Sequence, residues 1–185
     1  MNWTARRKRK VRRRRSLVAA GVVGVGLALL CLIGLLLGAE QVVSDQALLE
    51  RPPETIWRVL TDFDGMPLWR SDLTALERLP DLSGRPAWRE LGRNGVHVMQ
   101  LAAAESPRRL VFSRTRSGRP ALPVLTVLLV ASAHGTLVTL TEIDHIGNPL
   151  RRLFNRAYPP RSELVRFLRD LAQRVSGSRP IAHSP

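Results

Sequence analysis

The chain has 185 residues, with 29 Lys and Arg against 15 Asp and Glu, giving a formal net charge of +14. Taken whole, this charge is typical of a nucleic-acid-binding protein. However, nine of the basic residues lie within residues 1–16, which contain no acid, and the rest of the chain carries 20 basic and 15 acidic residues. The single cysteine, Cys31, excludes a disulfide framework and any multi-cysteine metal site, and the four histidines are scattered. The sequence therefore argues against nucleic acid as a partner and predicts no metal or other cofactor.

Residues 17–39 form a run of 23 residues without a charge. At a helical rise of about 1.5 Å per residue the run spans roughly 34 Å, which is enough for a hydrocarbon core of about 30 Å. A cleaved signal peptide is the main alternative, but its apolar region normally has about 7–15 residues, and cleavage after Ala39 would put the large Leu37 at position −3. We therefore expect an uncleaved transmembrane signal anchor.

The flanks of this run predict its orientation. The basic flank, residues 1–16, directly precedes it and Glu40 follows it, so the positive-inside rule places the N-terminus in the cytoplasm and residues 40–185 outside the cell membrane, as a single-pass protein. The flank can also attract anionic lipid head groups, at about 1 kcal/mol per basic residue near the surface, or bind nucleic acid as a disordered arm. Gly34 and Gly38 have the spacing of a helix-packing motif.

The segment after the anchor begins with a predicted strand over 42–50 and a short helix over 53–62. Pro53 suits the first position of that helix, and a second helical turn reaches Trp69. Six short apolar runs follow, separated by turn signals such as Asn94-Gly95, and this close spacing favours antiparallel pairing. We expect these strands over 73–79, 86–92, 96–104, 108–115, 123–132 and 136–146.

Helical periodicity returns near the C-terminus. Asn148-Pro149 starts a helical segment that Pro159-Pro160 interrupts, and Ser162 can cap the helix that follows, over 162–175. Apolar residues recur along this helix in one stripe, namely Leu164, Leu168, Leu171 and Val175. Residues 176–185 are expected to be disordered. The predicted fold class is α+β, with the last helix covering one face of the sheet.

Six sequence segments follow one another in a characteristic order: PETIWRVLTDF (53–63), MPLW (66–69), WRE (88–90), PRRLV (107–111), GTLVTLTE (135–142) and FLRDL (167–171). Together they resemble the START/Bet v 1-like (SRPBCC) superfamily, of polyketide cyclase/dehydrase and lipid-transport type. The resemblance implies a domain over 40–175 with a helix-grip fold, in which a seven-stranded antiparallel sheet wraps around the long C-terminal helix. It also implies an apolar cavity between sheet and helix, which in such domains commonly binds lipids, sterols, quinones or polyketides.

No catalytic set stands out from the residues. Asp62 and Asp64 are expected to shape the turn between the short helices, and Asp144-His145 to form a surface pair at a strand end. His97 alternates with Met99 on one strand face and can be either a satisfied polar residue at the cavity rim or a ligand-polarising group. The chain lacks a G-x-S-x-G elbow, a Gly-rich phosphate loop and an H-E-x-x-H motif.

The candidate ligand-binding residues are the aromatic and apolar side chains expected on the inner faces of sheet and helices. Core packing is the alternative role for each, and a shift of one residue in a strand would invert its faces. The candidates are Phe63, Met66, Trp69, His97, Met99, Phe112, Phe154, Leu164 and Leu168.

Four arginines cluster before the last helix, Arg151, Arg152, Arg156 and Arg161. They form either a solvated face or a docking site for anionic head groups.

The sequence thus predicts membrane-anchored binding of a hydrophobic, lipid-like small molecule in an apolar cavity. One alternative is a cyclase or dehydratase, which would need polar residues inside the cavity, such as His97 with an acidic partner. Another is a ligand-free module that binds a protein through its surface. A cavity below about 300 Å³ would count against ligand binding.

Overall fold

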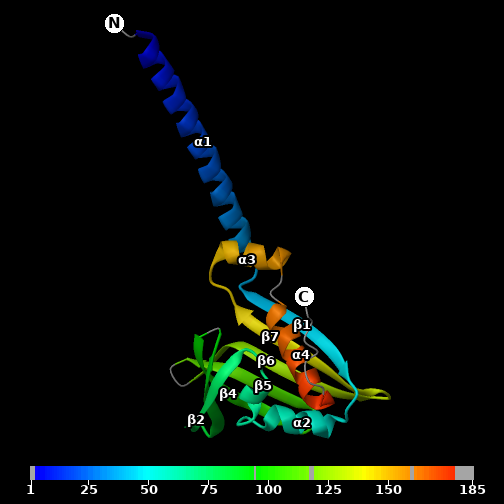
Figure 1. Cartoon of the computed structure of the whole chain (residues 1–185). Coiled ribbons are helices and arrows are strands. Elements are labelled where there is room, and N and C mark those ends of the chain that lie inside the picture. Colours follow the sequence, from blue (N-terminus) through cyan, green and yellow to red (C-terminus); the bar gives the residue numbers. More distant parts are fainter. Residues whose placement is uncertain (1–2, 94, 117–118, 159–160, 178–185) are drawn as a thin grey trace. The chain divides into compact units, whose positions relative to one another are not determined.

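The computed structural model describes residues 3–93, 95–116, 119–158 and 161–177 (Figure 1). The chain divides into two compact units, Met1–Ala39 with Ile146–Pro159, and Glu40–His145 with Pro160–Pro185. The second unit contains the sheet and the last helix, and we call it the sheet unit. The first unit contains the N-terminal helix and a short helix near residue 150, and we call it the helical unit.

The sheet unit has one seven-stranded antiparallel sheet, as the sequence predicts, and its fold class is α+β. The order is β1-β7-β6-β5-β4-β3-β2, so six consecutive strands form a meander and β1 is added beside β7. β1 pairs with β7 over its whole length, from Glu40 opposite His145 to Leu49 opposite Thr136. The strands are β1 (Glu40–Leu49), β2 (Leu73–Leu82), β3 (Arg85–Gly92), β4 (Gly95–Glu105), β5 (Arg109–Arg116), β6 (Arg119–Ser132) and β7 (Gly135–His145).

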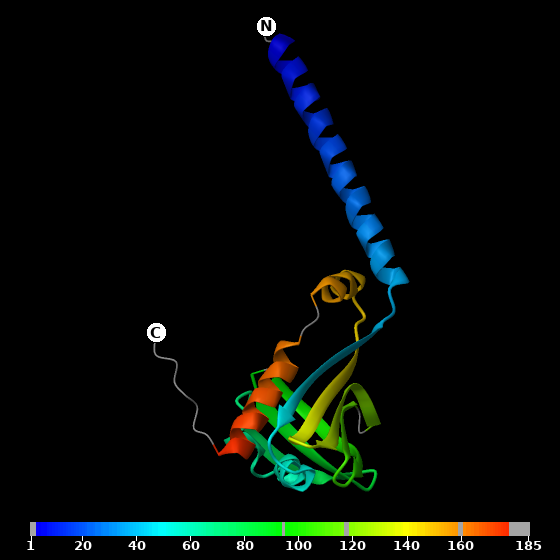
Figure 2. The same cartoon turned by 90° about the vertical axis from the view of Figure 1, so that its right-hand side faces the viewer.

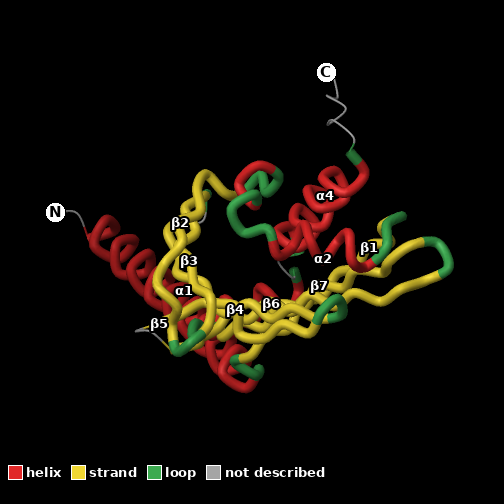
Figure 3. The backbone as a smooth tube through the Cα atoms, turned by 90° about the horizontal axis from the view of Figure 1, so that it is seen from below, coloured by secondary structure: helices red, strands yellow, loops and turns green. Residues whose placement is uncertain are grey.

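The sheet is strongly bent. Register shifts interrupt the β4–β5 ladder between Leu101 and Ala103, and the β5–β6 ladder between Ser113 and Arg114. Such bulges increase local twist. Figure 3 shows β2 and β3 turned up beside the face on which α2 (Pro53–Thr61) and α4 (Ser162–Ser176) lie. The sheet therefore curves around α4, which lies on one face of the sheet with β2 and β3 turned toward the same side, as the helix-grip prediction requires.

The core lies between this face and the helices. The predicted stripe of α4 is buried throughout, with Leu164, Leu168, Leu171 and Val175 at most 8% exposed, and Phe167 adds to it. Burying each such side chain contributes about 1.5–3 kcal/mol. On β7 the buried residues alternate, as expected of a strand with one covered face, and they are Thr136, Val138 and Leu140.

α2 closes one end of the core, near the C-terminal end of α4 (Figure 2). Its Ile56 and Leu60 are fully buried. Arg51, just before the helix, donates from Nε to the Val175 carbonyl at 3.1 Å, and its own carbonyl accepts from Thr136 Oγ1 at 2.7 Å. A 3-10 turn, η1 (Met66–Leu68), continues from α2, and Gly65 N donates to Asp62 Oδ1 at 3.1 Å, so Asp62 shapes this turn as expected.

The helical unit consists of α1 (Trp3–Leu36) and α3 (Pro149–Ala157). Asn148 caps α3, because its Oδ1 accepts from Leu150 N at 2.9 Å and Arg151 N at 3.2 Å. Arg152 donates to the Ile146 carbonyl at 2.6 Å and to the Leu37 carbonyl at 3.3 Å, which places a cation at the carbonyl-rich end of α1.

Gly34 is buried where α1 approaches α3. A Cβ at Gly34 would collide with the Pro149 carbonyl, whereas one at Gly38 would meet nothing within 4 Å. The first glycine of the predicted packing motif thus has a role within the chain itself.

Two local expectations change. The predicted cap at Ser162 is wrong: Ser162 is already helical, and Arg161 stands at the N-cap without a side-chain cap bond. The expected disorder at Ser176 is also wrong, because Ser176 is the last residue of α4, and Gly177 follows as the C-cap with a left-handed φ of 68°, typical of a helix C-terminus. The rest of the expected disordered tail lies outside the described residues, as does Asn94 of the predicted turn.

Within the part of the chain that the structure describes, none of the helices combines the length and hydrophobicity that a bilayer crossing requires. The anchor expected over 17–39 therefore stays a prediction from the sequence.

Candidate ligand cavity

A cavity of about 130 Å³ lies in the sheet unit, between the bent sheet and the N-terminal half of α4. Its lining comes from the segment before β2, from β2 to β7 and from α4. The lining residues are Arg70, Asp72, Leu73, Glu90, Gly92, Gly95, His97, Met99, Arg114, Leu125, Leu140, Glu142, Glu163, Leu164, Arg166 and Phe167.

One part of the lining is apolar. Leu140, Leu164 and Phe167 belong to the buried core, and Met99 and Leu125 pack against that core. Alternation along each strand brings these side chains to the covered face. This part can receive a hydrocarbon or aromatic group.

The other part of the lining is charged. Three arginines and four carboxylic acids contribute, so the lining carries a formal net charge of −1 with His97 neutral. The whole chain, by contrast, carries +14. The cavity is therefore locally acidic in a strongly basic protein.

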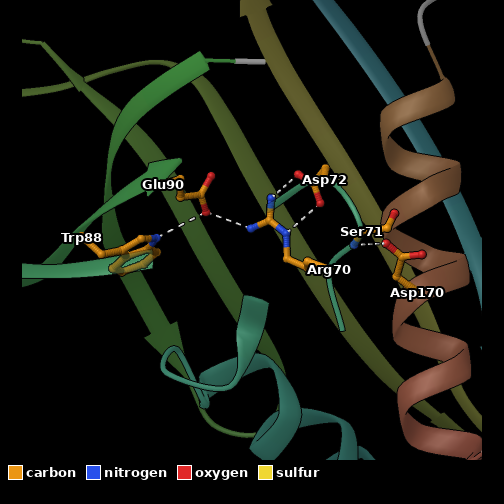
Figure 4. Close-up of polar contacts among 6 residues, drawn as sticks. All are labelled: Arg70, Ser71, Asp72, Trp88, Glu90 and Asp170. Atoms are coloured by element: carbon orange, nitrogen blue, oxygen red, sulfur yellow. Dashed lines mark hydrogen bonds and ion pairs between the residues drawn. The ribbon is translucent and has the colours of Figure 1, made fainter. Parts of the chain in front are cut away.

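Arg70 forms the best-defined polar cluster, shown in Figure 4. Its Nη2 and Nε donate to the two oxygens of Asp72 at 2.7 and 3.2 Å, and its Nη1 donates to Glu90 Oε1 at 2.8 Å. Trp88 Nε1 donates to the same Glu90 oxygen at 3.3 Å. Such two-pronged, charge-assisted contacts hold geometry as well as charge.

The cluster is mostly shielded from solvent, with side chains 13% exposed for Arg70 and 12% for Glu90. Burial lowers the pKa of the Arg70 guanidinium, but Glu90 and Asp72 more than offset this, so its pKa is raised overall. The guanidinium also lies 5.4 Å from the centre of the Phe167 ring on α4. Arg70 thus stays charged and joins β3 to α4.

The neighbouring backbone strengthens this link to α4. Ser71 N donates to Asp170 Oδ2 at 2.7 Å, and Asp170 is only 7% exposed (Figure 4). A buried carboxylate needs such donors, so the segment between η1 and β2 is fixed against the helix.

Glu142 on β7 has a different environment. None of the described residues donates a hydrogen bond to its carboxylate. Burial raises the pKa of Glu142, and the negative charges of Glu163 and Asp144 raise it further, while Arg114 lowers it. Arg114 Nε is itself buried without a hydrogen-bond partner among the described residues. The Glu142 carboxylate can therefore accept a hydrogen bond from a ligand, and Arg114 Nε can donate one.

His97 stands directly opposite Glu90 in the β3–β4 ladder, and Met99 stands opposite Arg114 in the β4–β5 ladder. Directly opposite residues in an antiparallel pair share a face of the sheet, which explains why all four line one cavity.

The sequence candidates separate into three groups. His97, Met99 and Leu164 line the cavity. Met66 and Phe112 line a second hollow of about 50 Å³, which shares Arg70, Glu90, Met99, Leu125 and Phe167 with the first.

The remaining candidates do not line either hollow. Phe63 stacks on Trp88 with ring centres 4.5 Å apart, Trp69 packs edge-on against Phe167 at 5.4 Å, and Leu168 lies in the core at 5% exposure. Phe154 belongs to α3 in the helical unit, where it is 63% exposed and its ring centre lies 5.3 Å from that of Tyr158.

The sequence reasoning missed the charged residues of the lining: Arg70, Asp72, Glu90, Arg114, Glu142, Glu163 and Arg166. For two of these residues, the spacing along a strand indicates that they face the core. Glu142 continues the alternation that buries Val138 and Leu140, and Glu90 lies two residues after buried Trp88.

The geometry agrees with the comparison to known families. The sequence model of the polyketide cyclase / dehydrase and lipid transport family matches residues 40–176. The chain belongs to this family. The match confirms the resemblance to START-type proteins, and it covers the sheet unit together with α3. A search of curated proteins found no match.

Solved structures similar to this family member include the Zhui aromatase/cyclase from Streptomyces sp. R1128, at 13% identity and a TM-score of 0.58 over 79% of this chain and 99% of that one. A START superfamily protein from Mycobacterium smegmatis has 16% identity and a TM-score of 0.57, over 74% and 97%. Protein MLL2253 from Mesorhizobium loti has 18% identity and a TM-score of 0.55, over 76% and 100%. At these identities the likeness concerns the fold.

Proposed function

We propose that the sheet unit binds a small amphiphilic molecule, with its apolar part against Leu140, Leu164 and Phe167 and its polar part toward Glu142 and Arg114. The observation that carries this proposal is the two-sided lining of the cavity, apolar on one part and charged on the other. Membership of a family described by lipid transport and polyketide cyclisation supports it.

The volume limits what the ligand can be. At about 130 Å³ the cavity is below the several hundred Å³ typical of drug-sized ligands, and below the limit of about 300 Å³ under which ligand binding is disfavoured. This counts against a whole lipid held inside this conformation, and it favours a smaller molecule or one that protrudes into solvent.

The energetics also favour a ligand with a polar group. Burying about 100 Å² of apolar ligand surface gives about 2.5 kcal/mol at about 25 cal/mol per Å². A millimolar complex needs roughly 4 kcal/mol. Polar contacts therefore have to supply the rest of the affinity.

A matched pair of variants tests the proposal. Met99 lines the cavity, whereas Val96 on the same strand is 60% exposed. Native mass spectrometry of the purified full chain should detect a co-purified small molecule in the wild type and in Val96→Trp, but not in Met99→Trp, which fills the cavity. Retained ligand in a folded Met99→Trp protein would refute the assigned site.

A second candidate function is acid–base catalysis on the bound molecule, as in a cyclase or dehydratase. The specific observation in its favour is that His97, Glu142 and Glu163 line the same cavity. Prolonged incubation of the co-purified molecule with the wild type and with His97→Gln tests it by mass spectrometry. Conversion that depends on His97 would support an enzyme, and an unchanged molecule would support binding alone.

We further propose that residues 17–39 tether the domain to the cell membrane, with the N-terminus cytoplasmic and the sheet unit outside. The support is the absence of charge in the run and the nine basic residues before it. In addition, apolar side chains from Val18 to Leu36 are widely exposed along α1, with Leu36 at 81%.

Carbonate extraction of membranes tests the tether. The wild type should stay in the pellet, and a Leu29→Arg/Ile33→Arg double variant should be released, since each arginine costs about 2.5–3.5 kcal/mol at the centre of a span. Release of the wild type would refute the tether. A C-terminal tag that resists external protease on spheroplasts would refute the orientation.

Anionic head groups are proposed as a further contact for the exposed arginines Arg151, Arg156 and Arg161. Arg152 is different, because its guanidinium already binds the carbonyls of Ile146 and Leu37. Vesicles with and without phosphatidylglycerol test this contact. Replacing the three exposed arginines with glutamine should reduce binding to the anionic vesicles only.

A further inference from the structure

The charged side chains around the cavity differ in how many partners they have within the protein. Arg70 is bound on one side by both oxygens of Asp72 and on the other by Glu90. This guanidinium is therefore saturated by two carboxylates, and the cluster as a whole carries −1. It offers no free cation to an anionic ligand.

Glu142 is the carboxylate least engaged by the protein. It is partly buried on β7, and none of the described residues donates a hydrogen bond to it. Glu163 on the first turn of α4 and Asp144 on β7 both repel its charge, and only Arg114 on β5 attracts it among the groups that shift its pKa. Partial burial of a carboxylate without a donor from the described residues costs free energy, and a ligand that donates hydrogen bonds relieves that cost.

The other charged or titratable groups of the lining do not reverse this pattern. Arg166 on α4 and Arg114 match the charges of Glu142 and Glu163, while the Arg70 cluster supplies the excess negative charge. His97 on β4 adds a charge only when protonated. Arg114 Nε is buried without an acceptor among the described residues, and a neutral oxygen of the ligand would be enough to satisfy it.

We propose that the cavity prefers ligands with a cationic, hydrogen-bond-donating group, such as a primary amine, over ligands with a carboxylate, and that Glu142 is the group that makes this choice. The inference rests on the proposed ligand-binding function and names the chemical class of its ligand. The apolar part of the ligand would contact Leu140 and Leu164, and its ammonium group would donate to the Glu142 carboxylate.

Three small molecules with the same phenyl group separate the possibilities: phenethylamine, 2-phenylethanol and 3-phenylpropionate. Isothermal titration calorimetry of the full chain at pH 7.5 should show the tightest binding for the amine, weaker binding for the alcohol and the weakest for the carboxylate. We expect a preference of about tenfold for the amine over the alcohol, as one charge-assisted contact would give.

The variant Glu142→Gln should lose that tenfold preference, because the affinity for the amine falls to about that for the alcohol. Glu77→Gln is the matched control, because Glu77 is an exposed glutamate on β2, with its side chain 56% exposed and paired with Arg89. It removes the same charge from the chain and should leave all three affinities unchanged.

The outcomes separate failure of the amine preference from failure of ligand binding itself. Binding of all three molecules with equal affinity, or best binding of the carboxylate through Arg114, would overturn the amine preference and leave the ligand-binding function standing. A preference for the amine that survives Glu142→Gln would overturn the role of Glu142. If none of the three binds, even at millimolar concentration, both the preference and the proposed binding of small amphiphiles fail.

Discussion

The Arg70 guanidinium holds both oxygens of the Asp72 carboxylate, two residues along the chain, at 3.2 Å from Nε and 2.7 Å from Nη2. The same guanidinium reaches across to Glu90 on β3 at 2.8 Å. Replacing Arg70 with alanine would remove the cation that pairs with Asp72 and Glu90, and Glu90 would keep only the donor Trp88 Nε1. We expect a loss of about 3 kcal/mol in the free energy of unfolding, measured by urea denaturation.

The control for this experiment is Arg78→Ala. Arg78 pairs with Asp81, but both side chains are about half exposed, at 49% and 48%. An exposed pair contributes about 0–1 kcal/mol. Equal losses in the two variants would show that shielding of the Arg70 cluster adds nothing to stability.

Glu142→Gln should change how stability depends on pH. Burial raises the pKa of Glu142 in the folded chain, with Glu163 and Asp144 acting in the same direction and Arg114 against it. The folded state therefore holds this proton more tightly than the unfolded state does. Its contribution to stability is complete below the ordinary glutamate pKa and is lost as pH rises through the folded value.

Glutamine cannot ionise, so the variant avoids that loss. Relative to the wild type, Glu142→Gln should gain stability as pH rises from 4 to 7.5 and should gain none at pH 4. Thermal unfolding across this range is the measurement. A difference that does not vary with pH would contradict the raised pKa, and Glu77→Gln provides the comparison for simple loss of a negative charge.

Gly135→Ala should destabilise the turn between β6 and β7. Gly135 has φ of 134°, and a Cβ there would collide with the Leu49 carbonyl on β1. Gly84 is a suitable control, since its φ is also positive, at 73°, but its Cβ would have open space. We expect a loss of about 1 kcal/mol for Gly84→Ala from backbone strain alone, and a larger loss for Gly135→Ala. Similar losses in chemical denaturation would contradict the role of the collision.

Leu171→Ala should loosen α4 from the sheet. Leu171 is fully buried, whereas Val165 on the same helix is 39% exposed. Truncation of the buried leucine should cost about 2–5 kcal/mol through lost burial and the cavity left behind, and Val165→Ala should cost far less. Urea midpoints of the two variants provide the test, and a small effect at Leu171 would mean that α4 is not part of the cooperative core.

The sheet was predictable because its signals are local. Each strand is bounded by turn residues, and the stripe from Leu164 to Val175 needs only helical spacing to be recognised. The Arg70 cluster could not be found in this way, because Glu90 lies twenty residues from Arg70 and meets it only after the sheet bends. Local spacing carries no information on such partners.

The cavity candidates show the same limit. Met99 and Leu164 followed from alternation and periodicity, and both line the cavity. Phe63 and Trp69 have the same apolar character, yet their rings pack on Trp88 and Phe167. Phe154 lies on a helix that associates with α1, and the charged lining depends on which strand faces meet. Side-chain chemistry alone does not distinguish core from cavity.

The position of β1 beside β7 has a consequence for how the domain is made. β1 leaves the ribosome before every other strand of the sheet, but its partner is the last strand to be synthesised. Ser44, for example, donates to the carbonyl of Leu140, 96 residues further along the chain. Contacts of such long sequence separation are slow to form, because loop closure must precede any gain from pairing. Until β7 has been synthesised, β1 therefore has no partner strand in this sheet, and the sheet can be completed only after that point.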